Sequence, residues 1–430
     1  MKKINLAVIG AGSTYTPELI DGLIRRREIL PLGQLRLMDI DSEKLRIVGG
    51  LCRRMLEAAQ VDAEVVLTQD MEQAIGGADF VIAQVRVGRL AARERDELIP
   101  EKYGLLGQET TGIGGMMKAL RTVPVIRQVA ETMERLAPEA WLINFSNPSG
   151  LVAQALKDDK PDRRILGLCN IPINMQAQAA RILGEDPAAL EYGFVGLNHL
   201  LYLHSVKKDG QECIGKVLDA PQETIMKNVP DISADAAFLK EIGTLPCSYL
   251  NYFYRTEDML KKNREAEKCR AQVCMDIEAD LLVQYDAPTL CEKPEGLDKR
   301  GGALYSEAAI SLVEAIFNDT GAVHTVNVRN GGAYPFMAAE DVVEVQARIG
   351  REGAVPMMLR DEIHPHIKEL MMQVKKYEKL TAKAALTGDR QALYAAAAAH
   401  PLIGDSEQAR ACLEEMLEAN KVYLPQFFKE

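Results

Sequence analysis

Two side chains that commonly bind metal ions follow apolar runs of the chain. Cys169 comes directly after "RILGL", and His199 comes one residue after "GFVGL". If these runs are strands, they carry a thiolate and an imidazole to the ligand-binding edge of a sheet, where the pair can bind a divalent cation. A structural zinc site takes four ligands, so a two-ligand site would be open, with substrate oxygens completing it. The alternative, a buried thiol and an unrelated histidine, stays open from these two residues alone.

A second group of residues has the pattern of a nucleotide-binding turn. Gly10 and Gly12 follow the apolar run "INLAVI" and precede the helix-like "TPELIDGLI". The first glycine permits a tight turn, and the second lets the backbone approach a pyrophosphate. The following helix N-terminus offers free N–H groups to phosphates, and Ser13 and Thr14 in this turn are predicted to bind the cofactor with the glycines. Tyr15 replaces the usual third glycine, so the pattern is incomplete.

Asp39 indicates which dinucleotide this turn would bind. It ends the apolar run "QLRLMD", where an acid can accept a hydrogen bond from a ribose hydroxyl. An acid there favours NAD over NADP, because it repels a 2′-phosphate. The alternative is an ordinary strand-to-helix turn. A plain hydroxy-acid dehydrogenase would also need a histidine base with an acid beside it, and no such pair is evident in the sequence.

Several polar clusters lie between these motifs. Arg93 belongs to the charged run "RLAARERDELIPEKYG", and Glu109 lies in the glycine-rich "GLLGQETTGIGG". Asn147, in "NFSNPSG", is held extended by the following proline, and Arg300 precedes a Gly-Gly turn in "DKRGGALYS". One arginine pointing inward would suffice to hold an anionic substrate. Charged runs are more often solvated helix faces, and glycine-rich stretches are more often surface turns.

The elements that must position these residues change character along the chain. In the first half, apolar strands alternate with helical segments, which predicts a doubly wound parallel sheet. The second half mixes strand-like segments with long helices, which predicts antiparallel sheet and a helical bundle. We expect one domain over residues 1–190 and a second over 191–430. The predicted strands are 4–12, 34–41, 63–70, 78–88, 141–150, 164–170, 199–210, 322–332 and 341–350; the predicted helices are 16–30, 42–60, 257–285, 367–401 and 406–427.

Composition narrows the class of protein. The chain has 430 residues and a net charge of -11, which argues against a nucleic-acid partner. No stretch reaches the roughly 18 apolar residues of a membrane helix, and the N-terminus lacks the form of a signal peptide, so we expect a cytoplasmic protein without a membrane partner. Eight cysteines without a Cys-x-x-Cys pair fit a reduced compartment.

Taken together, the motifs resemble glycoside hydrolase family 4, the NAD- and manganese-dependent glycosidases. The resemblance runs along nearly the whole chain through "IGAGSTYTPEL", "RERDELIPEKYGLLGQETTGIGG", "NFSNPSG", "GLCNIPI", "GLNHL", "SYLNYF", "KRGGALYS" and "VNVRNGGA". It implies a Rossmann-type domain followed by an α+β domain like that of lactate and malate dehydrogenases. It also implies NAD and Mn²⁺, or another divalent cation, as cofactors, and a homodimer or homotetramer.

The resemblance further implies a mechanism in which NAD⁺ takes a hydride from C3 of the sugar and a base then removes the acidified C2 proton. Cys169 and His199 would hold the metal, which stabilises the resulting enediolate. Tyr249 resembles the base, with Glu109 tuning it, and Tyr252 remains a rival for that role. The aglycone then leaves, water adds, and NADH returns the hydride.

The resemblance also bears on the substrate. It implies that Arg93 and Asn147 contact the sugar, and Arg300 is predicted to hold its anionic group. Asn170 is the informative position, because family members that cleave α-linked substrates carry Asp directly after the cysteine. We therefore expect a 6-phospho-β-glucosidase acting on substrates such as cellobiose 6-phosphate, with no leaving-group acid assigned. The alternatives are a 6-phospho-α-glucosidase, an α-galactosidase or an α-glucuronidase of the same family, or a plain NAD-dependent dehydrogenase.

Overall fold

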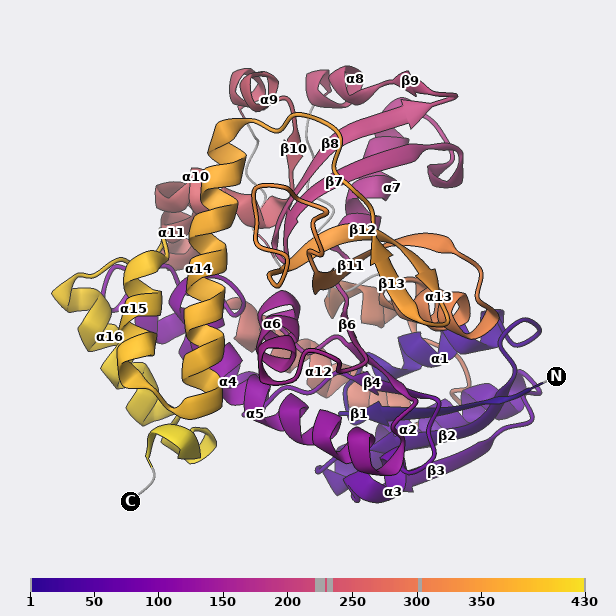
Figure 1. Cartoon of the computed structure of the whole chain (residues 1–430). Coiled ribbons are helices and arrows are strands. Elements are labelled where there is room, and N and C mark those ends of the chain that lie inside the picture. The colour runs from indigo at the N-terminus through magenta and orange to yellow at the C-terminus, as the bar shows by residue number, and fades with distance from the viewer. Residues whose placement is uncertain (1, 221–228, 230–234, 301–303, 429–430) are drawn as a thin grey trace.

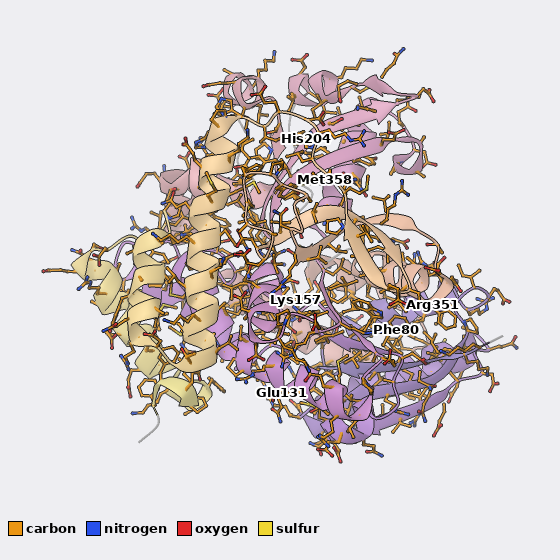
Figure 2. The ribbon with its side chains drawn as sticks, in the orientation of Figure 1. Phe80, Glu131, Lys157, His204, Arg351 and Met358 are labelled. Carbon is orange, nitrogen blue, oxygen red and sulfur yellow. The ribbon has the colours of Figure 1, made fainter. Side chains whose placement is uncertain are left out.

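A computed structural model describes residues 2–220, 229, 235–300 and 304–428 of the chain. A parallel sheet with its helices forms one end of the molecule, an antiparallel extension forms the other, and three C-terminal helices flank both (Figure 1). Side chains fill the space between sheet and helices (Figure 2), and Phe80, for example, is only 3% exposed. Among the described residues, no helix combines the length and apolarity that crossing a membrane requires.

The N-terminal half is a six-stranded parallel sheet in the order β3-β2-β1-β4-β5-β6. This order, with the reversal between β1 and β4, is that of a Rossmann fold, so the predicted fold class is confirmed. The inner strands are almost fully buried, as expected for a parallel sheet covered on both faces. The strands are β1 (Ile4–Ile9), β2 (Leu32–Met38), β3 (Glu64–Thr68), β4 (Phe80–Ala83), β5 (Trp141–Asn144) and β6 (Ile165–Gly167).

Helices connect these strands in the expected alternation. They are α1 (Thr16–Arg25), α2 (Ser42–Ala58), α3 (Met71–Ile75), α4 (Arg89–Glu101), α5 (Gly112–Leu136), α6 (Ser149–Asp159) and α7 (Ile171–Leu183). The predicted helix over 42–60 is present, and its N-cap is Asp41, whose side chain accepts a hydrogen bond from the Lys44 N–H. The stretch 78–88 was predicted as one strand, but only its first part is β4.

The second half extends the same sheet with antiparallel strands. The sheet continues from β6 in the order β11-β12-β7-β8-β10, while β13 pairs with β12 and β9 pairs with β8. The strands are β7 (Glu191–Leu197), β8 (Leu200–Lys208), β9 (Gln211–Glu212), β10 (Leu245–Pro246), β11 (Ala322–Arg329), β12 (Val342–Gly350) and β13 (Gly353–Pro356). Because β11 and β12 lie between β6 and β7, the sheet runs unbroken across the expected domain boundary at 190.

The remaining helices surround the antiparallel strands and the site. They are α8 (Ile214–Asp219), α9 (Ala236–Ile242), α10 (Asn251–Tyr254), α11 (Thr256–Glu265), α12 (Arg270–Asp286), α13 (Tyr305–Asn318), α14 (Pro365–Thr387), α15 (Arg390–Ala399) and α16 (Glu407–Ala419). Short 3₁₀ turns are η1 (Pro187–Ala189), η2 (Ser248–Leu250), η3 (Glu295–Arg300), η4 (Lys421–Tyr423) and η5 (Pro425–Phe427). The single helix predicted over 257–285 is wrong, because the chain breaks it into α11 and α12.

Candidate active site

The nucleotide turn between β1 and α1 has the tight geometry that its glycines predict. Gly10 has a φ of 88°, and a Cβ there would lie 2.9 Å from the backbone oxygen of Gln84. The Gly12 N–H donates to Asp39 Oδ2 at 2.8 Å, and a Cβ on Gly12 would lie 2.9 Å from the same oxygen. Asp39 follows β2 directly and therefore lies beside the turn, where the sequence predicted it.

The predicted anion-binding residue Arg300 also reaches this turn. Its guanidinium donates to Thr14 Oγ1 at 2.7 Å and lies 5.0 Å from the Tyr15 ring centre. Tyr285 donates to the Thr14 backbone oxygen at 2.8 Å, and Ser13 Oγ accepts from the Tyr15 N–H at 3.3 Å. The buried Nε of Arg300 has no hydrogen-bond partner among the described residues. Arg300 thus has a donor available for an anion beside the nucleotide turn.

Three cations surround the buried carboxylate of Glu109. Arg93 on α4 lies 3.0 Å from it, Lys118 on α5 lies 2.7 Å from it, and Arg86 forms a third ion pair. Burial alone would raise the pKa of Glu109, but these cations hold the pKa well below its usual range. Arg93 also pairs with Glu97 at 2.7 Å. Because the two arginines and the two carboxylates balance, the positive excess of the cluster is the charge of Lys118, and the cluster favours an anionic ligand when Lys118 is protonated.

Lys118 also contacts Glu109, although no motif in the sequence singled it out. Burial, together with the charge of Arg86, lowers the pKa of its ammonium to about 7. Its signal in the sequence is a single lysine inside the apolar run "GIGGMMKAL", where a solvated position is improbable. Arg86 was likewise not selected from its charged run, because only the fold brings it to Glu109.

Cys169 and His199 lie on either side of β11 and β12, the strands that join the two halves of the sheet. Cys169 follows β6, and His199 lies in the two-residue turn between β7 and β8; both are at most 5% exposed. The Asn198 side chain and the Ile171 N–H both hydrogen-bond to the Cys169 sulfur. The His199 ring stacks on Tyr249 with centroids 4.2 Å apart and planes 9° apart.

The donor set of this pair fits a divalent cation. Burial lowers the pKa of His199 to about 3, so its imidazole is neutral, and its buried Nδ1 has no hydrogen-bond partner among the described residues. Burial raises the pKa of the Cys169 thiol, so a cation must displace its proton. Within the described part of the chain, no group of three or more metal-binding side chains forms. The protein would therefore supply two ligands, and other oxygens would complete the shell.

Tyr249 lies beside this pair, and Tyr252 lies beside Tyr249. Tyr249 is on η2, Tyr252 is on α10, and their ring centres are 6.2 Å apart. Burial is the largest cause of the raised pKa of each phenol. The second cause is a nearby carboxylate, which is Glu109 for Tyr249 and Glu97 for Tyr252. Of the two tyrosines, only Tyr249 stacks on His199, so Tyr249 is better placed to act on a ligand bound at Cys169 and His199.

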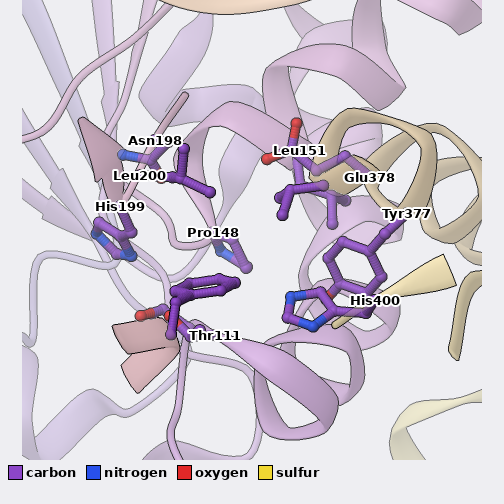
Figure 3. Close-up of a pocket in the computed structure, with 12 residues that line it drawn as sticks. Thr111, Pro148, Leu151, Asn198, His199, Leu200, Tyr377, Glu378 and His400 are labelled. Carbon is purple, nitrogen blue, oxygen red and sulfur yellow. The ribbon is translucent and has the colours of Figure 1, made fainter. Parts of the chain in front are cut away.

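The remaining predicted residues border the same region. Asn170 is 6% exposed and forms the N-cap of α7 directly after Cys169. Asn147 follows β5 and precedes Pro148, which lines a small cavity of about 20 Å³, room for about one water molecule. Figure 3 shows His199 and His400 on opposite sides of this cavity. Asn147 and Cys169 therefore follow the neighbouring parallel strands β5 and β6, and the turn that carries His199 reaches this region through Asn198, which accepts from the Gly150 N–H at 3.3 Å.

The architecture defines a Rossmann-type α/β protein, with a cysteine and a histidine buried where the two halves of its sheet join. Malate dehydrogenase from Cryptosporidium parvum shares the fold, with a TM-score of 0.56, 15% sequence identity, and coverage of 89% of this chain and 100% of that one. Residues 5–185 match the family described as Family 4 glycosyl hydrolase, and residues 194–403 match the Family 4 glycosyl hydrolase C-terminal domain. The chain belongs to this family.

Relatives in the family are similar over their full lengths. The chain is 42% identical to a probable 6-phospho-β-glucosidase of Bacillus subtilis strain 168, covering 100% of this chain and 99% of that protein. It is 37% identical to the 6-phospho-β-glucosidase of Escherichia coli strain K12, covering 99% of this chain and 97% of that protein. Among solved structures, the chain is similar to the Thermotoga maritima 6-phospho-β-glucosidase with manganese, NAD⁺ and glucose 6-phosphate. The TM-score is 0.90, the sequence identity is 34%, and the match covers 98% of this chain and 99% of that one.

Proposed function

We propose that the chain is an NAD- and divalent-metal-dependent 6-phospho-β-glucosidase. The observation that carries the proposal is that Tyr249 lies beside both the Cys169 thiol and a neutral His199, whose Nδ1 has no partner among the described residues, in a Rossmann fold whose nucleotide turn lies at the same sheet edge as Cys169. A hydrolase of the ordinary two-carboxylate kind needs neither feature. The cation cluster around Glu109 supports a phosphorylated substrate.

The β-linkage is supported by two independent observations. Asn170 stands directly after Cys169, where an Asp would mark a member that cleaves α-linked substrates. The 6-phospho-β-glucosidases of Bacillus subtilis, Escherichia coli and Thermotoga maritima are 42%, 37% and 35% identical to the chain. The phospho-α-glucosidase PagL of Clostridium acetobutylicum is 30% identical.

Each group of residues has a role in this proposal. Gly10, Gly12, Ser13, Thr14 and Asp39 bind the dinucleotide; Arg93, Asn147, Asn170 and Arg300 bind the phosphorylated sugar; and Cys169 and His199 hold the cation. Bound there, the dinucleotide accepts and returns a hydride, and the cation acts as a Lewis acid toward the sugar oxygens.

Tyr249 is the base that removes the C2 proton in this proposal. Burial keeps its phenol protonated at rest, and Glu109 acts in the same direction. Arg93 opposes both by favouring the phenolate. Tyr252 and Cys169 also raise the pKa of Tyr249, so the phenol stays protonated at rest, and a cation bound beside it would have to favour the phenolate.

The experiment is hydrolysis of p-nitrophenyl β-glucoside 6-phosphate with and without NAD⁺ and Mn²⁺. We expect turnover only when both are present, no net accumulation of NADH, and loss of deuterium from C2-labelled substrate to solvent. The matched control substrate is p-nitrophenyl α-glucoside 6-phosphate, which should react at least about tenfold more slowly, a difference of about 1.4 kcal/mol. Turnover without NAD⁺, or full retention of deuterium, would overturn the mechanism; preference for the α-substrate would overturn the linkage.

A further inference from the structure

A row of residues crosses the sheet where its two halves join. Gly167 on β6 pairs with Asn327 on β11, Asn327 pairs with Glu344 on β12, and Glu344 pairs with Gly196 on β7. The two glycines are the ends of the row, and each lies two or three residues before a predicted metal ligand. Glu344 is 0% exposed. A buried carboxyl in the middle of a sheet is costly unless hydrogen bonds compensate it.

The hydrogen bonds of Glu344 lead directly toward those ligands. Its Oε1 accepts from Asn327 Nδ2 at 3.0 Å and from Asn198 Nδ2 at 3.4 Å. Its Oε2 is buried and has no hydrogen-bond partner among the described residues. The carboxyl is therefore held from one side only, by two amides, and one of these amides belongs to the residue before His199.

Asn198 connects both predicted metal ligands. Its side chain hydrogen-bonds to the Cys169 sulfur, and its Oδ1 accepts from the Gly150 N–H at 3.3 Å. It is also the first residue of the two-residue turn whose second residue is His199. The orientation of the Asn198 amide therefore affects the sulfur and the imidazole together.

The turn itself needs such support. His199 has a φ of 63°, a left-handed conformation that costs a non-glycine residue roughly 1 kcal/mol. Two-residue hairpin turns favour glycine or asparagine at such positions. A histidine held there fixes the direction of the imidazole, provided that the neighbouring residue cannot rotate.

We propose that Glu344 is a positioning residue, which anchors the Asn198 amide and through it holds Cys169 and His199 in the arrangement that a divalent cation requires. The inference rests on the proposed metal role of these two residues. Hydrogen-bonding partners behind metal ligands commonly contribute a factor of 10 to 100 in metal affinity. A purely structural role, in which the buried polar row only sets strand register, is the competing explanation.

The test measures Mn²⁺ affinity by electron paramagnetic resonance of the free ion, with NAD⁺ and glucose 6-phosphate present, and measures NAD⁺ affinity separately. Glu344→Gln keeps an oxygen that accepts from both amides, so we expect Mn²⁺ affinity within about threefold of wild type. Glu344→Leu removes the acceptor and should weaken Mn²⁺ binding about 10- to 100-fold with NAD⁺ affinity unchanged. If the leucine variant does not fold, Glu344→Met, whose thioether is only a weak acceptor, takes its place with the same expected loss.

Tyr334→Phe is the matched control. The Tyr334 hydroxyl donates to the backbone oxygen of Glu344 at 2.7 Å, so this variant loses a buried hydrogen bond at the same residue and leaves the carboxyl in place. It should lower stability and leave Mn²⁺ affinity unchanged. If it weakens Mn²⁺ binding as much as Glu344→Leu does, the effect is structural and the proposal is overturned.

A double-mutant cycle tests whether Glu344 acts through Asn198. Asn198→Ala should weaken Mn²⁺ binding at least about tenfold, and Asn198→Ala with Glu344→Leu should bind no more weakly than Asn198→Ala alone. If the double variant loses Mn²⁺ affinity by the product of the two single losses, the proposal is overturned. A tenfold loss of Mn²⁺ affinity in Glu344→Gln would also overturn it. Wild-type protein that binds no Mn²⁺ would overturn the metal role itself and the positioning role with it.

Discussion

At the scale of single residues, burial decides which protonation states the site holds. It raises the pKa of the Cys169 thiol and the Tyr249 phenol and lowers that of the His199 imidazole, so all three are neutral at rest. Glu109 is equally buried but stays ionised, because Arg86, Arg93 and Lys118 surround it. The site thus places three neutral groups beside a charged cluster, and pKa values shifted apart in this way are typical of acid–base sites.

Tyr249 and Tyr252 are distinguished by a pair of matched substitutions. Tyr249→Phe should lower kcat at least about 100-fold with NAD⁺ affinity unchanged, because it removes the proposed base. Tyr252→Phe removes an equally buried hydroxyl and should lower kcat less than about tenfold. Exchange of the C2 deuterium during turnover is the direct measurement. A larger loss in the Tyr252 variant would move the base to that residue.

The sequence singled out individual candidate residues more readily than the side chains that contact them. Cys169, His199 and Tyr249 were each ambiguous locally, and the resemblance along the chain singled them out together. Arg86 and Lys118 were missed, because a charged run and an apolar helix do not reveal which side chain faces a buried carboxylate. Such contacts depend on how helices pack, which spacing along one helix does not determine.

At the scale of elements, the strands of the first half were predictable because parallel strands are continuous apolar runs. The break between α11 and α12 could not be predicted from the sequence, because no glycine or proline marks it. Cys269 caps α12 in a capping box with Gln272, and the Ala271 N–H donates to Glu97 Oε2 at 2.7 Å. That tertiary contact favours a new helix start, which in turn helps to hold Glu97 against Arg93.

The nucleotide turn gives a prediction about an element. Gly12→Ala should weaken NAD⁺ binding at least about tenfold, because the added Cβ would lie 2.9 Å from the Asp39 carboxylate and 3.1 Å from the Lys44 Cβ. Gly50→Ala on α2 is the control, since its Cβ would meet only the end of the Arg54 side chain at 3.5 Å. Gly50→Ala should leave dinucleotide affinity unchanged and stabilise the helix by up to about 1 kcal/mol. Fluorescence titration with NADH measures the affinity of both variants, and equal affinities in the two would contradict the steric argument.

At the scale of the whole molecule, the C-terminal helices support the site from behind. Arg121 on α5 donates to Asp96 Oδ1 on α4 at 2.9 Å and to Asn420 Oδ1, just after α16, at 3.0 Å. All three side chains are at most 2% exposed. The same two helices, α4 and α5, carry Arg93 and Lys118. The end of the chain is therefore tied to the elements that hold the cation cluster, a long-range contact that no local pattern in the sequence indicated.

Arg121→Met tests the buried contact of Arg121 with Asp96 and Asn420. Removing the guanidinium leaves Asp96 as a buried, unpaired charge, which should lower the free energy of unfolding by about 3–5 kcal/mol. Arg135→Met is the matched control on the same helix, because Arg135 pairs with Glu72 at 2.7 Å with more than half of each side chain exposed, and such pairs contribute at most about 1 kcal/mol. Urea denaturation followed by circular dichroism measures both. We expect the Arg121 variant to lose activity at a lower urea concentration than wild type, because its folded state is less stable. Equal losses of stability in the two variants would mean that the buried contact contributes no more than a surface ion pair.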